Sequence, residues 1–415
     1  MAGFGTTFNC NRWDALMFDY DVIIAGGGPV GTVAGYALAR AGLKVLVVET
    51  DTHCAEDLRA STFHPPSLEM LDALGVLEEM LPMGLKAPIY QYRIRQTGEI
   101  LAFDLGELGD RTAYPFRLQC EQWQLARLLA GRIGAMPGNE MAFSRRVVHF
   151  VQDADGVTVD LETPTAIETR RCRYLVAADG ANSIVRKWLG VGFSGFTYPE
   201  KFLCLSTNEP LEAHFDQLAY VNYVADPADW HVLLRVPRLW RVLVSADEAT
   251  SDADLKSDAN TAAVFGRLLG PEAQVETVHR TIYRVHQRVA ERYDHGRVVL
   301  IGDAAHLNNP LGGLGMNSGI HDAINLAEKL PKIIFEGADA PALLARFDRQ
   351  RRTVMHNFIQ AQTIANKRLI EVNNPQARAE VFAEMRGVNS DPDKRRDYLY
   401  KQAMFKSLDD AAAIQ

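Results

Sequence analysis

A glycine-rich turn between a strand and a helix, near the start of the chain, limits the possible folds more than any other feature. Residues 21–25 form a short apolar run typical of a buried parallel strand. Residues 26–31 read Gly-Gly-Gly-Pro-Val-Gly, and Pro29 suits the first turn of a following helix. A second apolar run, residues 44–49, ends at Glu49. The sequence therefore predicts a complete β-α-β unit.

The glycine spacing in this turn is that of dinucleotide-binding proteins. Gly26 permits a tight turn, Gly28 lets the backbone approach a pyrophosphate, and Gly31 lets helix and strand pack closely. The helix N-terminus offers unpaired N–H groups to phosphates, and Glu49 can accept the hydroxyls of an adenosine ribose. The alternative is a purely structural turn, but strand, helix and acid all stand where a dinucleotide needs them.

A second motif, Asp179-Gly180, follows the apolar residues 174–178. On its own it could be a plain turn, since Asp-Gly is a common turn pair. Asn182 and Ser183 can cap a helix that begins just after it. An aspartate beside a helix N-terminus suits a phosphate-containing ligand.

A third motif, Gly302-Asp303, follows residues 297–301 and leads into a glycine-rich turn at residues 310–317. An aspartate at a strand end can hold a sugar or ribityl hydroxyl. The glycines free backbone N–H groups near a helix expected to start at Asn317, where they would face negative charge on a reduced isoalloxazine ring. A structural loop is the alternative, but a chain that returns twice to one ligand indicates a flavin site.

The spacing of the first motif recurs at Gly190, Gly192 and Gly195. The Phe-Thr-Tyr-Pro that follows does not predict a helix, so we expect a loop and no second dinucleotide-binding domain.

Composition narrows the class of protein. The net charge of -8 disfavours nucleic acid or an anionic membrane as the main partner. Five widely spaced cysteines predict neither disulfides nor a metal site. The first twenty residues lack an apolar signal core, and no apolar run approaches the ~20 residues that span a bilayer. We expect a cytoplasmic protein.

Over residues 20–335 the three motifs, in this order, resemble the single-component FAD-dependent aromatic hydroxylases typified by para-hydroxybenzoate hydroxylase. Within that family, residues 59–66 and 84–88 resemble the para-nitrophenol 4-monooxygenase branch. The resemblance implies an α/β fold: a Rossmann-like FAD-binding domain, an inserted antiparallel-sheet substrate domain and a helical C-terminal region. The expected division is a leader (1–18), a discontinuous FAD-binding domain (19–90, 116–194, 286–330), a substrate domain (91–115, 195–285) and C-terminal helices (331–415).

Finer elements are expected from local pattern. Alternation predicts a hairpin at residues 146–151 and 156–161, and half-buried strands at 220–224, 231–236 and 241–245. An amphipathic helix is expected from Gln119 to Arg132.

The resemblance also implies residues that hold FAD. Without it, Arg59 would be a surface charge and Gln119 a helix cap; with it, both contact the ribityl region. Asp179 would serve FAD and the passing NAD(P)H, and Asp303 the ribityl chain. The implied cofactor residues are Gly26, Gly28, Pro29, Val30, Gly31, Glu49, Arg59, Gln119, Asp179, Asp303, Gly313, Leu314, Gly315, Met316 and Asn317.

The implied activity is hydroxylation of a phenol through a flavin C4a-hydroperoxide, with O2 and NADPH or NADH consumed. For para-nitrophenol the products would be benzoquinone and nitrite. The alternatives are a monooxygenase or epoxidase acting on a heteroaromatic or polyketide, and a non-catalytic FAD-binding redox protein. A flavin halogenase is disfavoured because no W-x-W stretch is present. A homodimer is a further expectation.

The substrate is expected between the flavin and the second sheet. By strand alternation, Tyr223, His231 and Leu233 would share one face there, and His231 would help deprotonate a phenol, although a buried packing role is the alternative. Pro310 would present a backbone carbonyl, and His306 would brace the loop. The family's carboxylate-binding arginine has no clear counterpart, which favours an uncharged or weakly acidic phenol.

Overall fold

The β-α-β unit predicted from the first motif is present in the computed structural model, which describes residues 17–415 except 57 and 59. β1 (Tyr20–Ala25) leads into α1 (Pro29–Arg40), and β2 (Val45–Val48) runs parallel to β1. The apolar side chains of both strands are buried, as expected for strands covered on both faces. The predicted cofactor residue Arg59 and most of the expected leader lie outside the described residues.

β1 and β2 belong to a first sheet, which has eight strands in the described part of the chain. Its order is β17-β18-β11-β1-β2-β8, and β18, β11, β1, β2 and β8 run parallel. The predicted hairpin is confirmed as β9 and β10, which pair antiparallel beside β11. The other strands of this sheet are β8 (Glu140–Ala142), β9 (Arg146–Gln152), β10 (Val157–Glu162), β11 (Ile167–Ala177), β17 (Asp294–His295) and β18 (Val298–Leu300).

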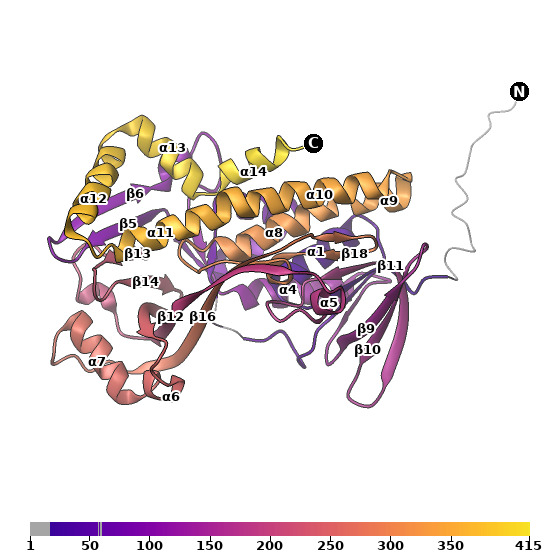
Figure 1. Cartoon of the computed structure of the whole chain (residues 1–415), viewed down its shortest axis with the longest axis horizontal. Coiled ribbons are helices and arrows are strands. Elements are labelled where there is room, and N and C mark those ends of the chain that lie inside the picture. Colours follow the sequence, from indigo (N-terminus) through magenta and orange to yellow (C-terminus); the bar gives the residue numbers. More distant parts are fainter. Residues whose placement is uncertain (1–16, 57, 59) are drawn as a thin grey trace, which may run out of the picture.

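A second eight-stranded sheet of the described residues runs in the order β19-β16-β12-β15-β14-β13-β5-β6, with only β13 and β5 parallel. Its strands are β5 (Ile89–Ile94), β6 (Glu99–Asp104), β12 (Phe193–Thr207), β13 (Val221–Ala225), β14 (His231–Val236), β15 (Leu239–Asp247), β16 (Thr277–Ala290) and β19 (His306–Leu307). The long strands β12 and β16 run side by side toward the first sheet (Figure 1). The domain borders expected after residues 194 and 285 fall inside these strands, so those borders stay predictions.

A small third sheet corrects one expectation. It is formed by β3 (Thr62–Phe63), β7 (Arg117–Gln119) and β4 (Leu85–Ala87). Gln119 ends β7 and pairs with Thr62 and Leu85, so the helix predicted from Gln119 begins instead at Gln122, as α4 (Gln122–Ala135). The backbone pairing of β7 outweighs the helical pattern of its side chains.

Two further boundaries differ from expectation. The helix expected at Asn317 is α8 (Leu314–Ala327), which begins earlier because Gly313 adopts a left-handed φ of 71° at its N-cap. Gly195, expected in a loop, lies within β12, although no helix follows it. The expected cap is confirmed: the Ser183 side chain accepts a hydrogen bond from the Arg186 N–H at the start of α5 (Ile184–Trp188).

Helices cover both sheets, and the C-terminal region is helical as predicted (Figure 1). α1 packs against α4 and α8. Phe382, Met385 and Leu399, from α12 and α13, bury apolar surface with side chains of β5 and β6. The other helices are α2 (Pro65–Ala73), α3 (Leu77–Met80), α6 (Asp252–Leu255), α7 (Asp258–Leu269), α9 (Leu330–Glu336), α10 (Ala340–Val354), α11 (Ala361–Glu371), α12 (Pro375–Ser390), α13 (Pro392–Gln402) and α14 (Phe405–Ala412).

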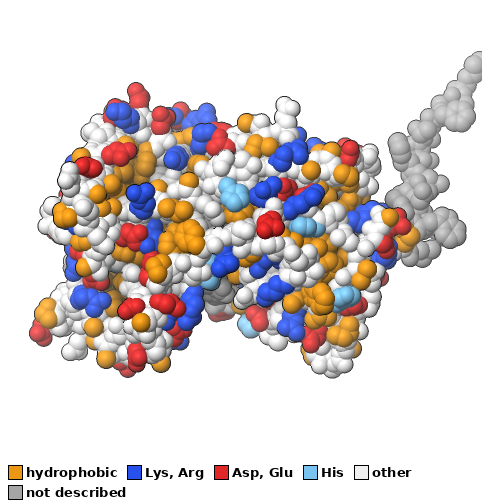
Figure 2. Space-filling view, in the orientation of Figure 1, with side chains coloured by type: hydrophobic (Ala, Val, Ile, Leu, Met, Phe, Trp, Pro, Cys, Tyr) orange, Lys and Arg blue, Asp and Glu red, His pale blue; other side chains and the backbone are white. Residues whose placement is uncertain are grey.

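The surface shows two lobes. Figure 2 shows a face notched at its lower edge, between the lobe with α6 and α7 and the lobe with β9 and β10. Acidic and basic side chains are interspersed over this face. None of the helices in the described residues combines the length and apolar character needed to cross a membrane.

Candidate active site

The glycines of the first motif are required by close backbone contacts. Gly26 has a φ of +102°, and a Cβ there would lie 2.3 Å from the carbonyl oxygen of Ala178. A Cβ at Gly31 would lie 2.0 Å from the carbonyl oxygen of Gly26. In contrast, no atom of the described residues would lie within 4 Å of a Cβ at Gly28. Gly26 and Gly31 therefore build the turn, and Gly28 leaves its outer side open.

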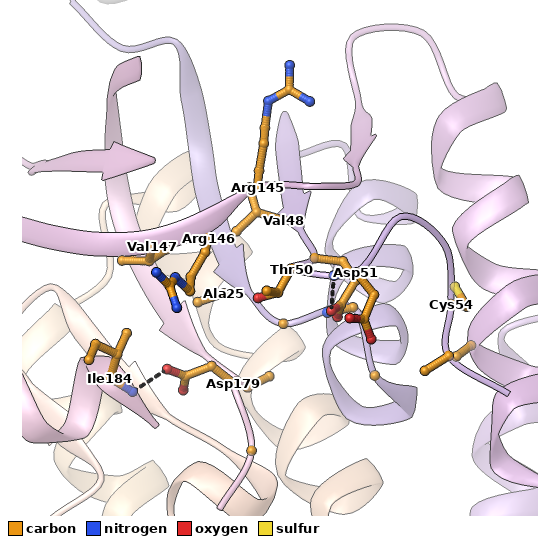
Figure 3. Close-up of a pocket in the computed structure, with 18 of the residues that line it drawn as sticks. Ala25, Val48, Thr50, Asp51, Cys54, Arg145, Arg146, Val147, Asp179 and Ile184 are labelled. Carbon is orange, nitrogen blue, oxygen red and sulfur yellow. Dashed lines mark hydrogen bonds between the residues drawn. The ribbon is translucent and has the colours of Figure 1, made fainter. Parts of the chain in front are cut away.

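That open side faces a cavity of about 620 Å³, here called the first cavity (Figure 3). Its wall includes residues 26–29, Glu49, Asp179 and Gly180. Glu49 is held by two backbone donors, since its Oε2 accepts from the Gly27 N–H at 2.7 Å and its Oε1 from the Asp51 N–H at 3.0 Å. A carboxylate has about four lone-pair sites, so both oxygens keep acceptor capacity toward the cavity.

Asp179 follows the end of β11 by two residues, and its Oδ2 accepts from the Ile184 N–H at 2.8 Å (Figure 3) and from the Val185 N–H at 3.2 Å. These are the first residues of α5, so the carboxylate sits at a helix N-terminus as predicted. Its Oδ1 is buried and has no hydrogen-bond partner among the described residues. Burial raises the pKa of the Asp179 carboxyl. The orphaned oxygen is an acceptor available to a ligand in the first cavity.

A second cavity, of about 310 Å³, lies between the second sheet and the glycine-rich turn. Asp303, Pro310 and residues 311–316 line it from the turn side. Ala181 lines it as well, while its neighbours Gly180 and Asn182 line the first cavity. One loop therefore borders both cavities, which suits an elongated ligand that extends from one to the other.

The three motifs are also tied together through two side chains: Arg186, which the sequence did not single out, and Val30. Arg186 is 5% exposed and donates to the carbonyl oxygens of Ala181 at 2.7 Å and Ala304 at 2.8 Å, linking the second and third motifs. Val30 packs against Gly302, since a Cβ there would lie 3.1 Å from a Val30 methyl group. Val30, predicted to hold the cofactor, thus packs the first motif on the third and does not line the first cavity.

Behind the third motif lies a buried charged network. The Asp322 carboxylate accepts from the Gly302 N–H at 3.0 Å, from His306 Nε2 at 2.6 Å and from Arg351 Nε at 2.6 Å. Burial alone would raise the pKa of Asp322, but the charges and hydrogen bonds of His306 and Arg351 hold this pKa at about 2. The network fixes the backbone beside Asp303, with His306 bracing the loop.

Gln119 and Asn317 brace the site rather than line the second cavity. Asn317 is fully buried; its Oδ1 accepts from the His64 N–H, and its Nδ2 donates to the carbonyl oxygens of Thr62 and Gly313. Gln119 Oε1 accepts from Thr62 Oγ1 at 3.0 Å, and its buried Nε2 has no partner in the described part of the chain. Thr62, which lines the second cavity, is thus held by both amides.

The expectation that Tyr223, His231 and Leu233 share one face is wrong. In the antiparallel pair β13–β14, Tyr223 lies opposite Val232, whereas His231 lies opposite Val224 and Leu233 opposite Asn222. Directly opposed residues point to the same face, so Tyr223 faces the second cavity with Val232 and Leu234.

His231 and Leu233 point to the other side of the second sheet. Leu233 packs there with Val224 and with Phe265 of α7. His231 is 2% exposed, its Nδ1 lies 3.1 Å from the Asp229 carbonyl oxygen, and burial lowers its pKa to about 4. It is a neutral packing residue at ordinary pH and does not reach the second cavity.

The structure places an arginine in the second cavity, although the sequence offered no clear counterpart of the family's carboxylate-binding arginine. Arg241 of β15 is 3% exposed and lines the second cavity. Its Nη1 donates to Ser61 Oγ at 3.2 Å, its Nη2 lies 3.5 Å from Tyr283 Oη, and its Nε has no partner among the residues described. A guanidinium stays charged when buried, so Arg241 is a buried cationic donor in a wall rich in apolar side chains (Val232, Leu234, Leu243, Val285). Arg284 also lines this cavity, but its side chain is half exposed and pairs with Asp252 at 3.3 Å.

Comparison with known proteins shows which family the chain resembles in sequence and structure. Residues 19–362 match a family model described as an FAD binding domain. The chain is 34% identical over 385 residues to para-nitrophenol 4-monooxygenase of Pseudomonas sp. strain WBC-3, covering 91% of this chain and 94% of that protein. It is 33% identical over 386 residues to 6-hydroxy-3-succinoylpyridine 3-monooxygenase of Pseudomonas putida S16, covering 91% and 96%. Among solved structures, p-nitrophenol 4-monooxygenase of Pseudomonas putida DLL-E4 superposes with a TM-score of 0.88 and 31% identity, covering 94% of this chain and 98% of that one.

Proposed function

This chain belongs to the FAD-dependent aromatic hydroxylases, a family of flavoprotein monooxygenases, and we propose that it hydroxylates an acidic phenol bound in the second cavity. Para-nitrophenol is the first candidate substrate, with benzoquinone and nitrite as products, because the relatives named for that activity align over nearly their whole length. The observation that carries the proposal is Arg241, a buried guanidinium beside the glycine-rich turn.

The described residues fit FAD as the cofactor. The open side of Gly28 would admit a pyrophosphate, the free lone pairs of Glu49 would accept ribose hydroxyls, and the orphaned Oδ1 of Asp179 supplies a further acceptor. Asp303 would hold the ribityl chain from the second cavity. Arg59 would join this set. When reduced by NAD(P)H, FAD supplies the activation of O2 that the reaction requires.

The glycine-rich turn and α8 would stabilise negative charge. Gly313, Leu314, Gly315 and Met316 line the second cavity at the N-terminus of a 14-residue helix, where backbone N–H groups lack intrahelical partners. Such donors act strongly where water is excluded. Asn317 holds this turn through three hydrogen bonds and thereby keeps the donors in place.

Arg241 would bind the substrate as its phenolate. A phenol that has lost its proton is a stronger nucleophile toward an electrophilic oxygen, and a fixed cation lowers the pKa of the bound phenol. The apolar wall formed by Val232, Leu234, Leu243 and Val285 would exclude water from the ring. Because His231 lies outside the second cavity, we do not assign it the role of accepting the phenolic proton.

A hydroxypyridine is the second candidate substrate. The relative named as a 6-hydroxy-3-succinoylpyridine 3-monooxygenase covers the same share of this chain as the para-nitrophenol 4-monooxygenase does. The hydroxypyridine in its name, like a phenol, has an acidic hydroxyl group on an aromatic ring.

The test follows NADPH and NADH oxidation by the FAD-loaded enzyme across a panel of phenols and hydroxypyridines, with product mass and nitrite measured. We expect para-nitrophenol to stimulate oxidation at least about tenfold and to release nitrite. Stimulation only by hydroxypyridines would replace para-nitrophenol with the second candidate. If neither class gives stimulation or an oxygenated product, the proposed substrate chemistry fails.

A further inference from the structure

A third cavity, of about 390 Å³, lies apart from the two already described, between α8, α10 and α14. In Figure 1, α10 and α14 lie along the upper part of the molecule. The cavity is lined by Lys329, Lys332, Arg346 and Arg351 against one carboxylate, that of the exposed Glu328. We propose that this cavity, here called the basic cavity, is a binding site for a small organic phosphate.

Three of its cations lack a carboxylate partner. In the described part of the chain, no carboxylate oxygen lies within 4.0 Å of the charged groups of Lys329, Lys332 or Arg346, whereas Arg351 is paired with Asp322. Lys332 has no side-chain hydrogen bond to another described residue, and Arg346 makes one, from Nε to the Ile414 carbonyl oxygen at 3.4 Å. Positive charge thus accumulates locally in a chain whose net charge is -8.

The buried lysines of the molecule offer a direct contrast. Among described residues three are buried: Lys201, Lys329 and Lys367. Lys201 pairs with Asp252 at 3.1 Å, and Lys367 pairs with Glu200 and Glu371. Lys329 has neutral acceptors only: the Asn325 carbonyl and amide oxygens, at 3.2 and 2.7 Å, and Gln350 Oε1 at 3.1 Å.

A buried ammonium without a carboxylate partner is destabilised relative to its neutral form, and the pKa of Lys329 reflects this. Burial lowers its pKa to about 8; Glu328 opposes the shift, and Arg346, Arg351 and Lys332 add to it. A bound anion would reverse this shift by supplying the missing countercharge.

The shape and lining of the basic cavity indicate the ligand class. Ammonium and guanidinium groups together suit phosphate oxygens, and the volume falls at the small end of the roughly 300–1,000 Å³ typical of ligand sites. Ile324, Leu343 and Leu408 give it an apolar wall, which would cover an organic group attached to the phosphate. We therefore expect an organic phosphate to bind more tightly than inorganic phosphate.

Calorimetric titration of the FAD-loaded enzyme, without NAD(P)H and at constant ionic strength, tests the proposal. The probes are inorganic phosphate, glycerol 3-phosphate and succinate. The double variant Lys332→Ala/Arg346→Ala should weaken glycerol 3-phosphate binding at least about tenfold, since two charge-assisted contacts are lost. The control Arg238→Ala/Lys256→Ala removes two exposed cations elsewhere and should bind like the unmodified enzyme.

Tighter binding of glycerol 3-phosphate than of inorganic phosphate or succinate, lost only in the cavity variant, supports the site. Absence of binding up to about 10 mM, equal binding by both variants, or succinate binding as tightly as the phosphates overturns it. The cavity variant keeps the phenol-binding residues, so phenol-stimulated NAD(P)H oxidation can be measured independently of this result.

Discussion

The first and second cavities are built in different ways. The first cavity is walled mainly by short turns, each following a strand of the parallel sheet, such as residues 26–29 after β1 and Asp179 after β11. The second cavity collects side chains from residues 60–62, from β12 to β16 and from the turn at 310–316. The residues of a cavity made of local turns can be recognised from short sequence motifs. The residues of a cavity made by distant strands depend on how those strands pair, which the sequence alone does not determine.

The most severe expected effect falls on the first cavity, because an enzyme that has lost FAD loses its whole activity. Gly31→Ala places a Cβ where 2.0 Å separates it from the Gly26 carbonyl oxygen, so the turn cannot keep its form. We expect bound FAD, measured from the ratio of flavin to protein absorbance, to fall at least about tenfold. The matched control is Gly134→Ala, at a position in α4 where a Cβ meets nothing within 4 Å. This variant should keep FAD, and its free energy of unfolding should rise by roughly 0.5–1 kcal/mol. Full flavin content in Gly31→Ala would contradict the role of this turn in FAD binding.

The second cavity should be separable from FAD binding. Arg241→Met removes the buried guanidinium, and we expect FAD to stay bound while kcat/KM for an acidic phenol falls about 100-fold, or roughly 3 kcal/mol, as for other lost charge-assisted contacts. Arg235→Met is the control, because Arg235 lies on neighbouring β14 and lines neither cavity. Equal losses in both variants, or loss of FAD in Arg241→Met alone, would count against a substrate role for Arg241.

A substitution on the side of the second sheet that faces away from the second cavity should change stability but not activity. The pKa of His231 is lowered from 6.5 to about 4, so its neutral form stabilises the fold above pH 6.5, and that contribution is lost as pH falls toward 4. Urea unfolding between pH 7 and pH 4 should therefore show His231→Gln losing about 3 kcal/mol less stability than the unmodified enzyme. The pH profile of kcat/KM should be the same in both. A shifted profile would return His231 to the reaction.

The smallest expected effect is on substrate size. Leu234 faces the second cavity and Leu233 faces away, although they are neighbours in β14. Leu234→Ala should change the relative kcat/KM of bulky and small phenols about tenfold, or roughly 1.4 kcal/mol. Leu233→Ala should leave that ratio unchanged while lowering the free energy of unfolding by about 2–5 kcal/mol. A changed ratio in Leu233→Ala would show that the face assignment is wrong.

Sequence reasoning reached the fold through features that are local. The strand before Gly26, the glycine spacing and the cap at Ser183 act within a few residues of one another, and each was present as expected. The same reasoning misplaced Gln119, because β7 is a strand only by pairing with β3 and β4. Val30 and Asn317 stay predicted cofactor residues, and the structure adds that both make contacts between segments far apart in the chain.

The residues of the second cavity were predicted least well, for a physical reason. Alternation along β13 and β14 tells which residues of one strand share a face, but not how the two strands pair. The pairing of Tyr223 with Val232 decided that His231 points away. Arg241 carried no sequence signal, because an arginine in a strand reads as exposed until its burial is known. Asp322 was missed likewise, since its partners come from two segments apart from it in the sequence: Gly302 and His306 from the loop of the third motif, and Arg351 from α10.

The most direct test of the two-cavity account is a crystal structure of the FAD-loaded enzyme soaked with para-nitrophenol. We expect the ADP half of FAD to lie in the first cavity. We expect the phenol ring to lie in the second cavity, with its oxygen within hydrogen-bond distance of Arg241. Phenol density on the His231 side of the second sheet, or a flavin ring distant from residues 313–316, would contradict it.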